Sequence, residues 1–133
     1  MENNQAVYLA GGMSSGWQAR VISELRGQFT FYNPAEHAIQ NGEEYTAWDL
    51  HYVRCSDIVF AYMEETNPSG IGLSLEVGFA RALGKTVILV DEKSVADLAF
   101  AHRFHIVRET ASITLNSLAD GMRVLQSFVR GVH

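Results

Sequence analysis

Short runs of β-branched and aromatic residues recur along the chain and predict the strands of a sheet. They are separated by segments whose hydrophobic positions repeat every three or four residues, the spacing of an amphipathic helix. The predicted strands cover residues 6–10, 28–32, 57–63, 86–90 and 103–107. The predicted helices cover residues 17–26, 43–54, 72–83, 94–101 and 115–130.

The alternation of strands and helices predicts the fold class. The last helix shows the pattern well, with Leu115, Leu118, Met122, Leu125 and Val129 along one face. Right-handed crossovers between successive strands then produce a mostly parallel sheet. We expect a single-domain, doubly wound α/β fold over residues 1–133, with a mostly parallel five-stranded sheet and helices on both faces. This arrangement is of the flavodoxin-like or Rossmann-like type.

The composition narrows the classes of function. A chain of 133 residues, 47% hydrophobic and 19% charged, is typical of one soluble globular domain. Its net charge of −5 disfavours a nucleic-acid polymer or an anionic membrane and favours a small-molecule partner. The first residues lack the pattern of a signal peptide, and no apolar run approaches the roughly 18 to 20 residues of a membrane span. We therefore expect a cytoplasmic protein.

Signals for a metal site or a disulfide are weak. Cys55 is the only cysteine, which excludes an intrachain disulfide and a multi-cysteine metal site. His102 and His105 lie at a predicted helix-to-strand junction, and two histidines without a third ligand make a poor metal site. The sequence therefore predicts no bound metal.

Ligands of a doubly wound sheet bind beyond the carboxyl ends of its strands. The loops predicted at that edge are residues 11–16, the pair Asn33-Pro34 and residues 64–70. Asp91 lies at the same edge, where an aspartate commonly bonds the backbone of a turn. Asp57 opens the third strand, so we expect it at the opposite edge as a structural acid.

One carboxylate stands out in the predicted helix over residues 72–83. Between residues 71 and 83, Glu76 is the only acid, among residues that are apolar or small apart from Ser74 and Arg81. Burying a carboxylate is costly unless it is paired or used. The glycine-rich turn before the helix places Glu76 near free backbone N–H groups, which favour the ionised carboxylate. We therefore predict that Glu76 is a nucleophile.

The glycine loop after the first strand is a second candidate site. Its Gly-Gly-x-x-x-Gly spacing differs from the dinucleotide-binding fingerprint, and no acid closes the second strand, so nicotinamide binding is disfavoured. The loop either brings backbone N–H groups and the Ser14 and Ser15 hydroxyls to a sugar or phosphate, or simply connects strand to helix. Tyr8, in the first strand, faces either the pocket or the solvent. His37 is either a substrate contact or a polar loop residue.

Three segments together resemble the nucleoside 2-deoxyribosyltransferase superfamily. They are Tyr8-Leu9-Ala10-Gly11-Gly12, Asp49 followed eight residues later by Asp57, and the run from Ser69 to Gly78 that contains Glu76. The superfamily includes deoxyribosyltransferases and nucleoside 5′-monophosphate N-glycosidases. The similarity covers roughly the first two thirds of the chain and follows the same order of elements.

This resemblance implies a mechanism and a set of roles. The glutamate matching Glu76 attacks the anomeric carbon of a ribose or deoxyribose, and a second displacement retains the configuration. The tyrosine matching Tyr8 orients that glutamate, and the acid matching Asp49 contacts the leaving base. Gly11, Gly12, Ser14, Ser15, Asn33, Ser69 and Gly70 would surround the sugar or phosphate. Such chemistry needs no cofactor, and family members form homodimers in which a neighbour often completes the pocket.

The chain also departs from both branches of the superfamily. Transferases carry an aspartate before the glycine turn, where this chain has Asn67, Ser69 and Gly70. The monophosphate hydrolases usually have an arginine in the first glycine loop, where this chain has Met13, Ser14 and Ser15. A non-catalytic module that binds or senses nucleotides is therefore the alternative to an enzyme that cleaves or exchanges an N-glycosidic bond.

Overall fold

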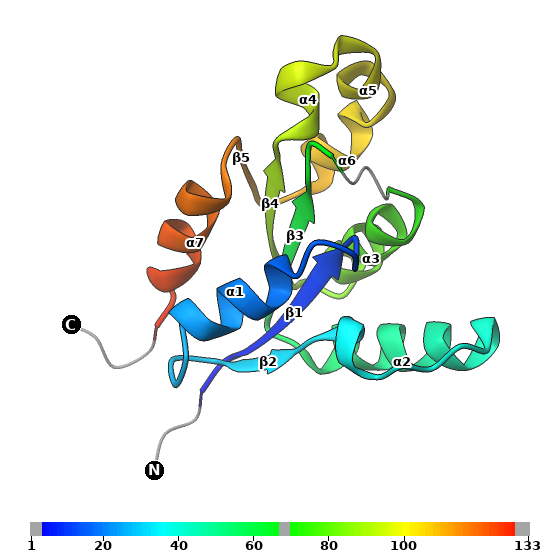
Figure 1. Ribbon diagram of the computed structural model, residues 1–133, viewed down its shortest axis with the longest axis vertical. Helices are drawn as coiled ribbons and strands as arrows, with labels where there is room; N and C mark the ends of the chain where they lie inside the picture. The colour runs from blue at the N-terminus through cyan, green and yellow to red at the C-terminus, as the bar shows by residue number, and fades with distance from the viewer. Residues whose placement is uncertain (1–3, 67–69, 130–133) are drawn as a thin grey trace.

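A five-stranded, entirely parallel sheet forms the centre of the molecule (Figure 1). The structure is a computed structural model that describes residues 4–66 and 70–129. The strands are β1 (Ala6–Gly11), β2 (Thr30–Tyr32), β3 (Ile58–Met63), β4 (Thr86–Asp91) and β5 (Ile113–Leu115), in the order β2-β1-β3-β4-β5. The strand order reverses between β1 and β3, which is the switch point where doubly wound sheets bind ligands. The predicted fold class is confirmed.

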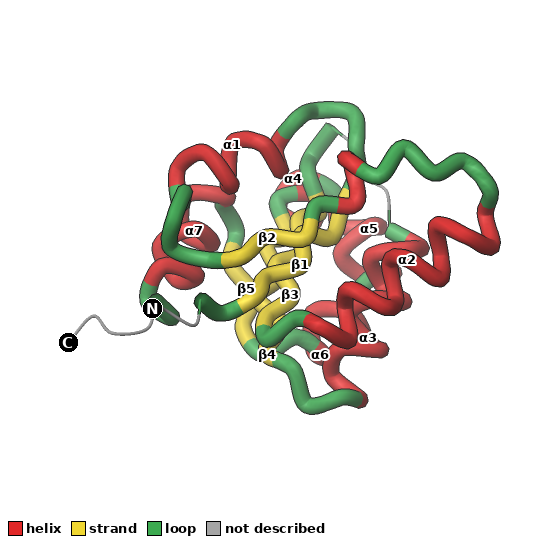
Figure 2. Tube along the Cα trace, turned by 90° about the horizontal axis from the view of Figure 1, so that it is seen from below, coloured by secondary structure: helices red, strands yellow, loops and turns green. Residues whose placement is uncertain are grey.

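Helices cover both faces of the sheet (Figure 2). One face carries α1 (Trp17–Glu24) and α7 (Leu118–Gln126). The other carries α2 (Gly42–Cys55), α3 (Ile71–Ala82), α5 (Leu98–Arg103) and α6 (His105–Thr110), while the short α4 (Lys93–Ala96) follows β4 at the carboxyl edge of the sheet. A short 3-10 helix, η1 (Pro34–Glu36), follows β2. No helix among the described residues is long and apolar enough to cross a membrane.

Strand periodicity divides β1 between two hydrophobic cores. Val7 and Leu9 pack toward α1 and α7, while Tyr8 and Ala10 pack toward α2 and α3. Successive side chains of a strand point to opposite faces, so the assignment of one residue fixes its neighbours. Tyr8 is fully buried and therefore faces the inside of the molecule rather than solvent.

The end of the chain corrects three predictions. Residues 103–107, predicted as the fifth strand, lie at the end of α5 and the start of α6. The true fifth strand, β5, has only three residues, and it includes the position where the last helix was predicted to begin. That helix, α7, begins at Leu118 because the Ser117 side chain accepts a hydrogen bond from the Asp120 N–H and caps it. The predicted helix over residues 94–101 is interrupted at Asp97, which caps α5.

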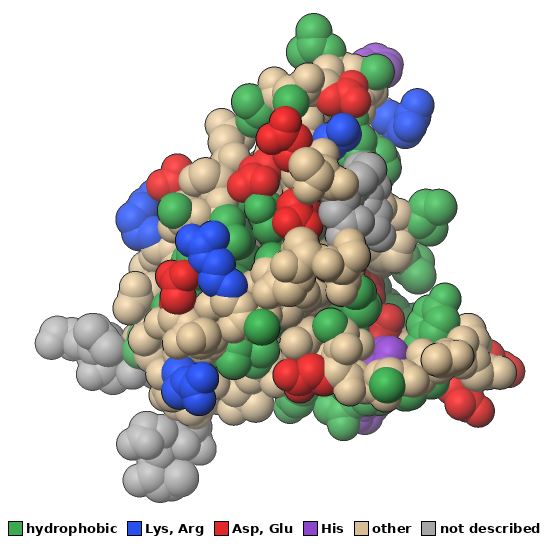
Figure 3. Space-filling model, viewed as in Figure 1, with side chains coloured by type: hydrophobic (Ala, Val, Ile, Leu, Met, Phe, Trp, Pro, Cys, Tyr) green, Lys and Arg blue, Asp and Glu red, His purple; other side chains and the backbone are tan. Residues whose placement is uncertain are grey.

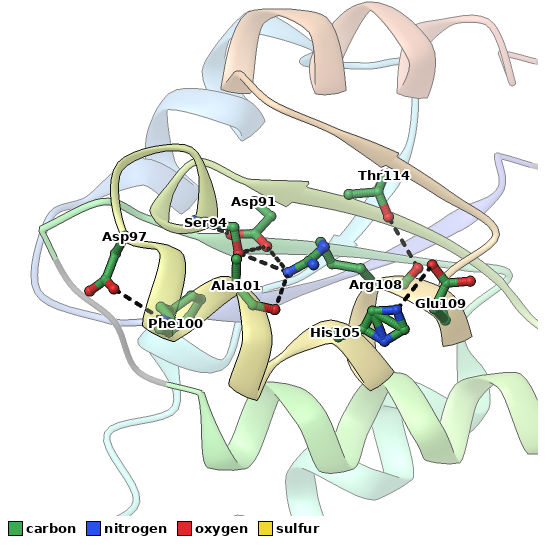
Figure 4. Close-up of polar contacts among 9 residues, drawn as sticks. All are labelled: Asp91, Ser94, Asp97, Phe100, Ala101, His105, Arg108, Glu109 and Thr114. Atoms are coloured by element: carbon green, nitrogen blue, oxygen red, sulfur yellow. Dashed lines mark hydrogen bonds and ion pairs between the residues drawn. The ribbon is translucent and has the colours of Figure 1, made fainter.

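Arg108 fastens this extra helical segment to the sheet (Figure 4). Its Nη1 donates hydrogen bonds to Ser94 Oγ at 2.9 Å and to Ala101 O at 3.0 Å, and lies 3.4 Å from Asp91 Oδ2. Asp91 also accepts a hydrogen bond from the Ser94 N–H at 2.9 Å, as expected for a turn aspartate. Asp57 lies at the opposite edge, where its Oδ2 accepts a hydrogen bond from the Ala6 N–H at 2.8 Å. Both aspartates are structural.

The contact between α7 and the sheet depends on Gly121. A Cβ at this position would overlap the Val90 side chain and lie 3.0 Å from the Phe60 ring. Gly121→Ala should therefore lower the free energy of unfolding by about 1–3 kcal/mol, although alanine favours helices. Urea denaturation measures the change.

Gly78→Ala is the matched control. Gly78 lies inside α3, and nothing would meet its Cβ within 4 Å. This substitution should raise stability by about 0.5–1 kcal/mol, because alanine costs less backbone entropy in a helix. Equal effects of the two substitutions would contradict the close approach of α7 to the sheet.

Candidate active site

An open cavity of about 800 Å³ lies at the carboxyl edge of the sheet, on the side covered by α2 and α3. It is enclosed by the loop after β1, by η1, and by one face each of α2 and α3. Its lining residues are Gly11, Gly12, Met13, Ser14, Pro34, Tyr45, Thr46, Asp49, Ile71, Gly72, Leu73, Leu75 and Glu76. Two of these are acids, and no lysine, arginine or histidine is among them.

Glu76 lies in the second turn of α3, with its carboxyl group largely withdrawn from solvent. The Tyr8 hydroxyl donates a hydrogen bond to Glu76 Oε2 at 2.9 Å. Burial raises the pKa of Glu76 to about 8, against the opposing effect of the Tyr8 hydrogen bond, while nearby Asp49 raises it further. The N–H groups at the helix N-terminus were expected to keep Glu76 ionised. That expectation is corrected, because Glu76 lies in the second turn, beyond the free N–H groups.

Tyr8 is the donor that satisfies the buried carboxyl group. Its pKa is raised above the ordinary value, first by burial and then by the charges of Glu76 and Asp49. The phenol therefore keeps its proton and serves as a hydrogen-bond donor. Since Tyr8 and Glu76 are 68 residues apart in sequence, this contact joins the first strand to the third helix.

Asp49 faces the same cavity from α2, just past the middle of the helix. Burial raises its pKa, against the opposing effects of His37 and Tyr8. His37 Nε2 lies 3.3 Å from Asp49 Oδ1. Because His37 Nδ1 accepts a hydrogen bond from the Ile39 N–H at 2.9 Å, the ring proton must lie on Nε2. His37 thus donates a hydrogen bond to Asp49 and holds the orientation of its carboxyl group.

The cavity brings together only part of the predicted site. It is lined by Gly11, Gly12, Ser14, Asp49 and Glu76, and Tyr8 reaches it through the Glu76 hydrogen bond. Gly11 has φ of 152°, and a Cβ there would lie 2.7 Å from Tyr62 O, so only glycine fits without a shift.

The other predicted substrate contacts lie elsewhere. Ser15 lines a smaller cavity of about 200 Å³ with Arg20 and Tyr62. Asn33 Oδ1 accepts a hydrogen bond from the Ala35 N–H at 3.0 Å and caps η1. Gly70 lines a neighbouring cavity and packs against the Phe104 ring. Ser69 and Asn67 lie outside the described residues.

Sequence reasoning missed the α2 residues that accompany Asp49. Tyr45 and Thr46 line the cavity, and Tyr45 lies one helical turn before Asp49 on the same face. The signal that could have found Tyr45 is its spacing of four residues from Asp49, which becomes informative once Asp49 is assigned to the site. His37 contacts Asp49 rather than lining the cavity.

Within the described residues, no group of three His, Cys, Asp or Glu side chains is placed to hold a metal ion. His105 forms an exposed contact with Glu109, four residues later on α6. Acidic side chains gather near the ends of β3 and β4 (Figure 3). This local charge would repel a polyanion.

The candidate site is thus a cavity with two carboxylates at the switch point of a doubly wound parallel sheet. Residues 4–94 match the family described as "Nucleoside 2-deoxyribosyltransferase like". Because this match spans about two thirds of the 133 residues, the chain belongs to that family. The resemblance predicted from the sequence is confirmed. No curated protein sequence matches the chain.

Solved structures share the fold at low sequence identity. A 2-deoxyribosyltransferase from Leishmania mexicana has a TM-score of 0.71 and 13% identity, over 93% of this chain and 98% of that one. The CMP N-glycosidase BcmB of Clostridium botulinum has a TM-score of 0.59 and 18% identity, over 93% and 99% of the two chains. BlsM has a TM-score of 0.66 and 17% identity, over 96% and 90%. These neighbours show the fold.

The raised pKa of Glu76 predicts a specific dependence of stability on pH. Between its ordinary pKa of 4.5 and the folded value of about 8, the folded state binds more protons than the unfolded state. The Glu76 contribution to stability should therefore fall as pH rises through this range, with a slope of at most about 1.4 kcal/mol per pH unit. Urea denaturation of the wild type and of Glu76→Gln, from about pH 5 to about pH 8, measures the difference in slope.

Glu92→Gln is the control for this measurement. Glu92 Oε1 also accepts a tyrosine hydroxyl, from Tyr62 at 2.7 Å, but on the other face of the sheet. Glu92→Gln should keep the wild-type slope. An unchanged slope in Glu76→Gln would show that Glu76 titrates in the folded protein as it does in the unfolded chain.

Proposed function

We propose that the protein cleaves or exchanges the N-glycosidic bond of a nucleoside or nucleoside 5′-monophosphate through a covalent intermediate on Glu76. The observation that carries the proposal is the buried Tyr8–Glu76 hydrogen bond at 2.9 Å, in a cavity that also contains Asp49. A carboxylate held by a tyrosine and accompanied by a second acid has the parts of a retaining glycoside cleavage. Family membership supports a nucleoside as substrate.

In the first step, a carboxylate oxygen of Glu76 attacks C1′ of the sugar. The C1′–N bond breaks, its electron pair goes to the departing base, and the Asp49 carboxyl group supplies the proton. In the second step, water or a second base attacks C1′, Asp49 accepts the proton of that nucleophile, and the Glu76 carboxylate is released. The two displacements restore both acids and retain the configuration at C1′.

The proposed reaction starts from a shared proton. Both carboxyl groups have raised pKa values, and Glu76, with a pKa of about 8, is the group that holds this proton near neutral pH. In the proposed mechanism the proton passes from Glu76 to Asp49 before the attack, which leaves an ionised nucleophile and a protonated acid. Tyr8 supports this transfer, because its hydroxyl donates a hydrogen bond to Glu76 Oε2 and favours the ionised carboxylate.

Incubation with a panel of nucleosides and nucleoside 5′-monophosphates, with and without an acceptor base, tests the proposal. Chromatography follows the free base, and mass spectrometry of acid-quenched enzyme detects a sugar adduct on the peptide that contains Glu76. Glu76→Gln should abolish the adduct and lower base release by about 10³-fold or more, because the nucleophile is lost. Glu92→Gln, with its matched tyrosine contact, should retain activity.

Each other outcome has a defined meaning. Exchange of the base without free sugar identifies a transferase, and accumulation of free sugar identifies a hydrolase. Tight binding with no base release from any substrate of the panel would contradict the enzymatic proposal and favour a nucleotide-binding module. Activity of Glu76→Gln equal to that of the wild type would contradict the assigned nucleophile.

We also propose that the protein is a homodimer whose interface includes the exposed N-terminal part of α3. Ile71 and Leu75 lie there one turn apart and are 89% and 58% exposed. Ile106 of α6 lies beside α3 and is also exposed. A contiguous apolar surface at the rim of a cavity is typical of an interaction site, and a second copy covering it would reduce the access of water to the reaction.

Leu75→Glu tests the interface. Placing a charge in the apolar face should convert the dimer to a monomer, because a buried unpaired carboxylate is costly. Sedimentation measures the mass, and circular dichroism checks that the fold is kept. Val95→Glu, at an exposed apolar position on α4, should leave the dimer intact. A wild-type protein that is monomeric over a wide concentration range would contradict the proposed dimer.

A further inference from the structure

One backbone carbonyl under the candidate site receives two buried side-chain donors. Trp17 Nε1 lies 2.9 Å from Gly12 O, and Gln18 Nε2 lies 3.0 Å from the same oxygen. Both side chains belong to α1, and their exposed fractions are 4% and 1%. Such a carbonyl has two lone pairs, so the two donors together occupy its full capacity. The peptide that joins Gly12 to Met13 is therefore held in one orientation.

That orientation decides where the next N–H points. The C=O and N–H of a trans peptide lie in one plane and point in opposite directions, and no described peptide bond is cis. The Gly12 carbonyl accepts both hydrogen bonds from α1, so the Met13 N–H points away from α1. Gly12 and Met13 both line the candidate cavity. Among the described residues, the Met13 N–H has no hydrogen-bond acceptor.

The choice of residue at position 18 points to a role beyond filling the core. Gln18 is fully buried, and its amide donates to the Gly12 carbonyl, a hydrogen bond that an apolar side chain of similar size could not make. Trp17 also limits the loop, since its ring would lie 3.0 Å from a Cβ at Gly11. Trp17 and Gln18 thus hold the loop on the side that faces α1, while the cavity lies on its other side.

We propose that Gln18 and Trp17 are positioning residues that aim the Met13 N–H at an oxygen of the substrate, either a sugar hydroxyl or a phosphate. No lysine, arginine or histidine is among the described residues that line the cavity, so a fixed backbone donor is the group suited to receive such an oxygen beside two acids. The identity of the ligand rests on the proposed function, but the orientation of the Met13 peptide does not.

Amide NMR tests this proposal directly. Uniformly ¹⁵N-labelled Glu76→Gln protein, in which turnover is blocked, is titrated with cytidine, adenosine and their 5′-monophosphates. The Met13 amide resonance should shift on binding. A shift with the nucleosides alone identifies a sugar hydroxyl as the acceptor, whereas a shift only with the monophosphates identifies the phosphate.

Gln18→Met separates positioning from packing. Methionine fills the same space without the donor, so ligand affinity should fall by about threefold to tenfold and the Met13 shift should diminish. In the otherwise wild-type enzyme, KM should rise by the same factor while kcat stays within about twofold, as for an interaction shared by ground and transition states. Gln126→Met, which removes an exposed amide on α7, should change neither value.

Three results would overturn the proposal. They are a Met13 resonance that none of the four ligands moves, a Gln18→Met variant that binds as tightly as the control, and a variant that loses melting temperature and kcat while KM is unchanged. Failure of the proposed function has a different signature. In that case the wild type binds a ligand and releases no base, while the Met13 shift and its dependence on Gln18 persist.

Discussion

The hydrogen bond between Tyr8 and Glu76 is the contact on which the candidate site depends. A carboxyl group inside an otherwise apolar helix face is costly to bury without a partner, and the donor comes from the first strand of the sheet. The bond therefore couples the position of α3 to the register of β1. It also sets the chemistry, because the same contact that satisfies the acid resists the rise in its pKa that burial causes.

Supporting contacts recur around the cavity, and each comes from a residue outside the lining. His37 holds Asp49 from the loop after η1, and Gln18 holds the Gly12 carbonyl from α1. A lining group oriented by a second, buried group loses less freedom when a substrate binds. The cavity thus combines an open mouth with supports fixed by hydrogen bonds, and the described residues that line it include no lysine or arginine.

Sequence reasoning predicted the elements whose pattern is strong and long. The strands β1, β3 and β4 are buried and six residues long, so their apolar runs were distinct. It failed at β5, which has three residues, because so short an edge strand carries no readable period. The β-branched pair Ile106-Val107 was misread as part of a strand. Ile106 is apolar although it is exposed on α6, so the segment does not show the apolar and polar sides of an amphipathic helix.

The same distinction holds within the site. Glu76 was identifiable from the residues alone, as the one acid in a predicted apolar helix that follows a loop at the carboxyl edge, whereas Asp49 was assigned only through the family resemblance. Asn33 and Ser15 were misplaced, because the direction of a loop side chain depends on local hydrogen bonds such as the one from the Ala35 N–H. Topology therefore places a loop residue at the correct edge of the sheet but does not give the direction of its side chain. Its partner in the turn decides whether it faces the cavity, and for Gly12 that partner is a glutamine on the opposite face of the sheet.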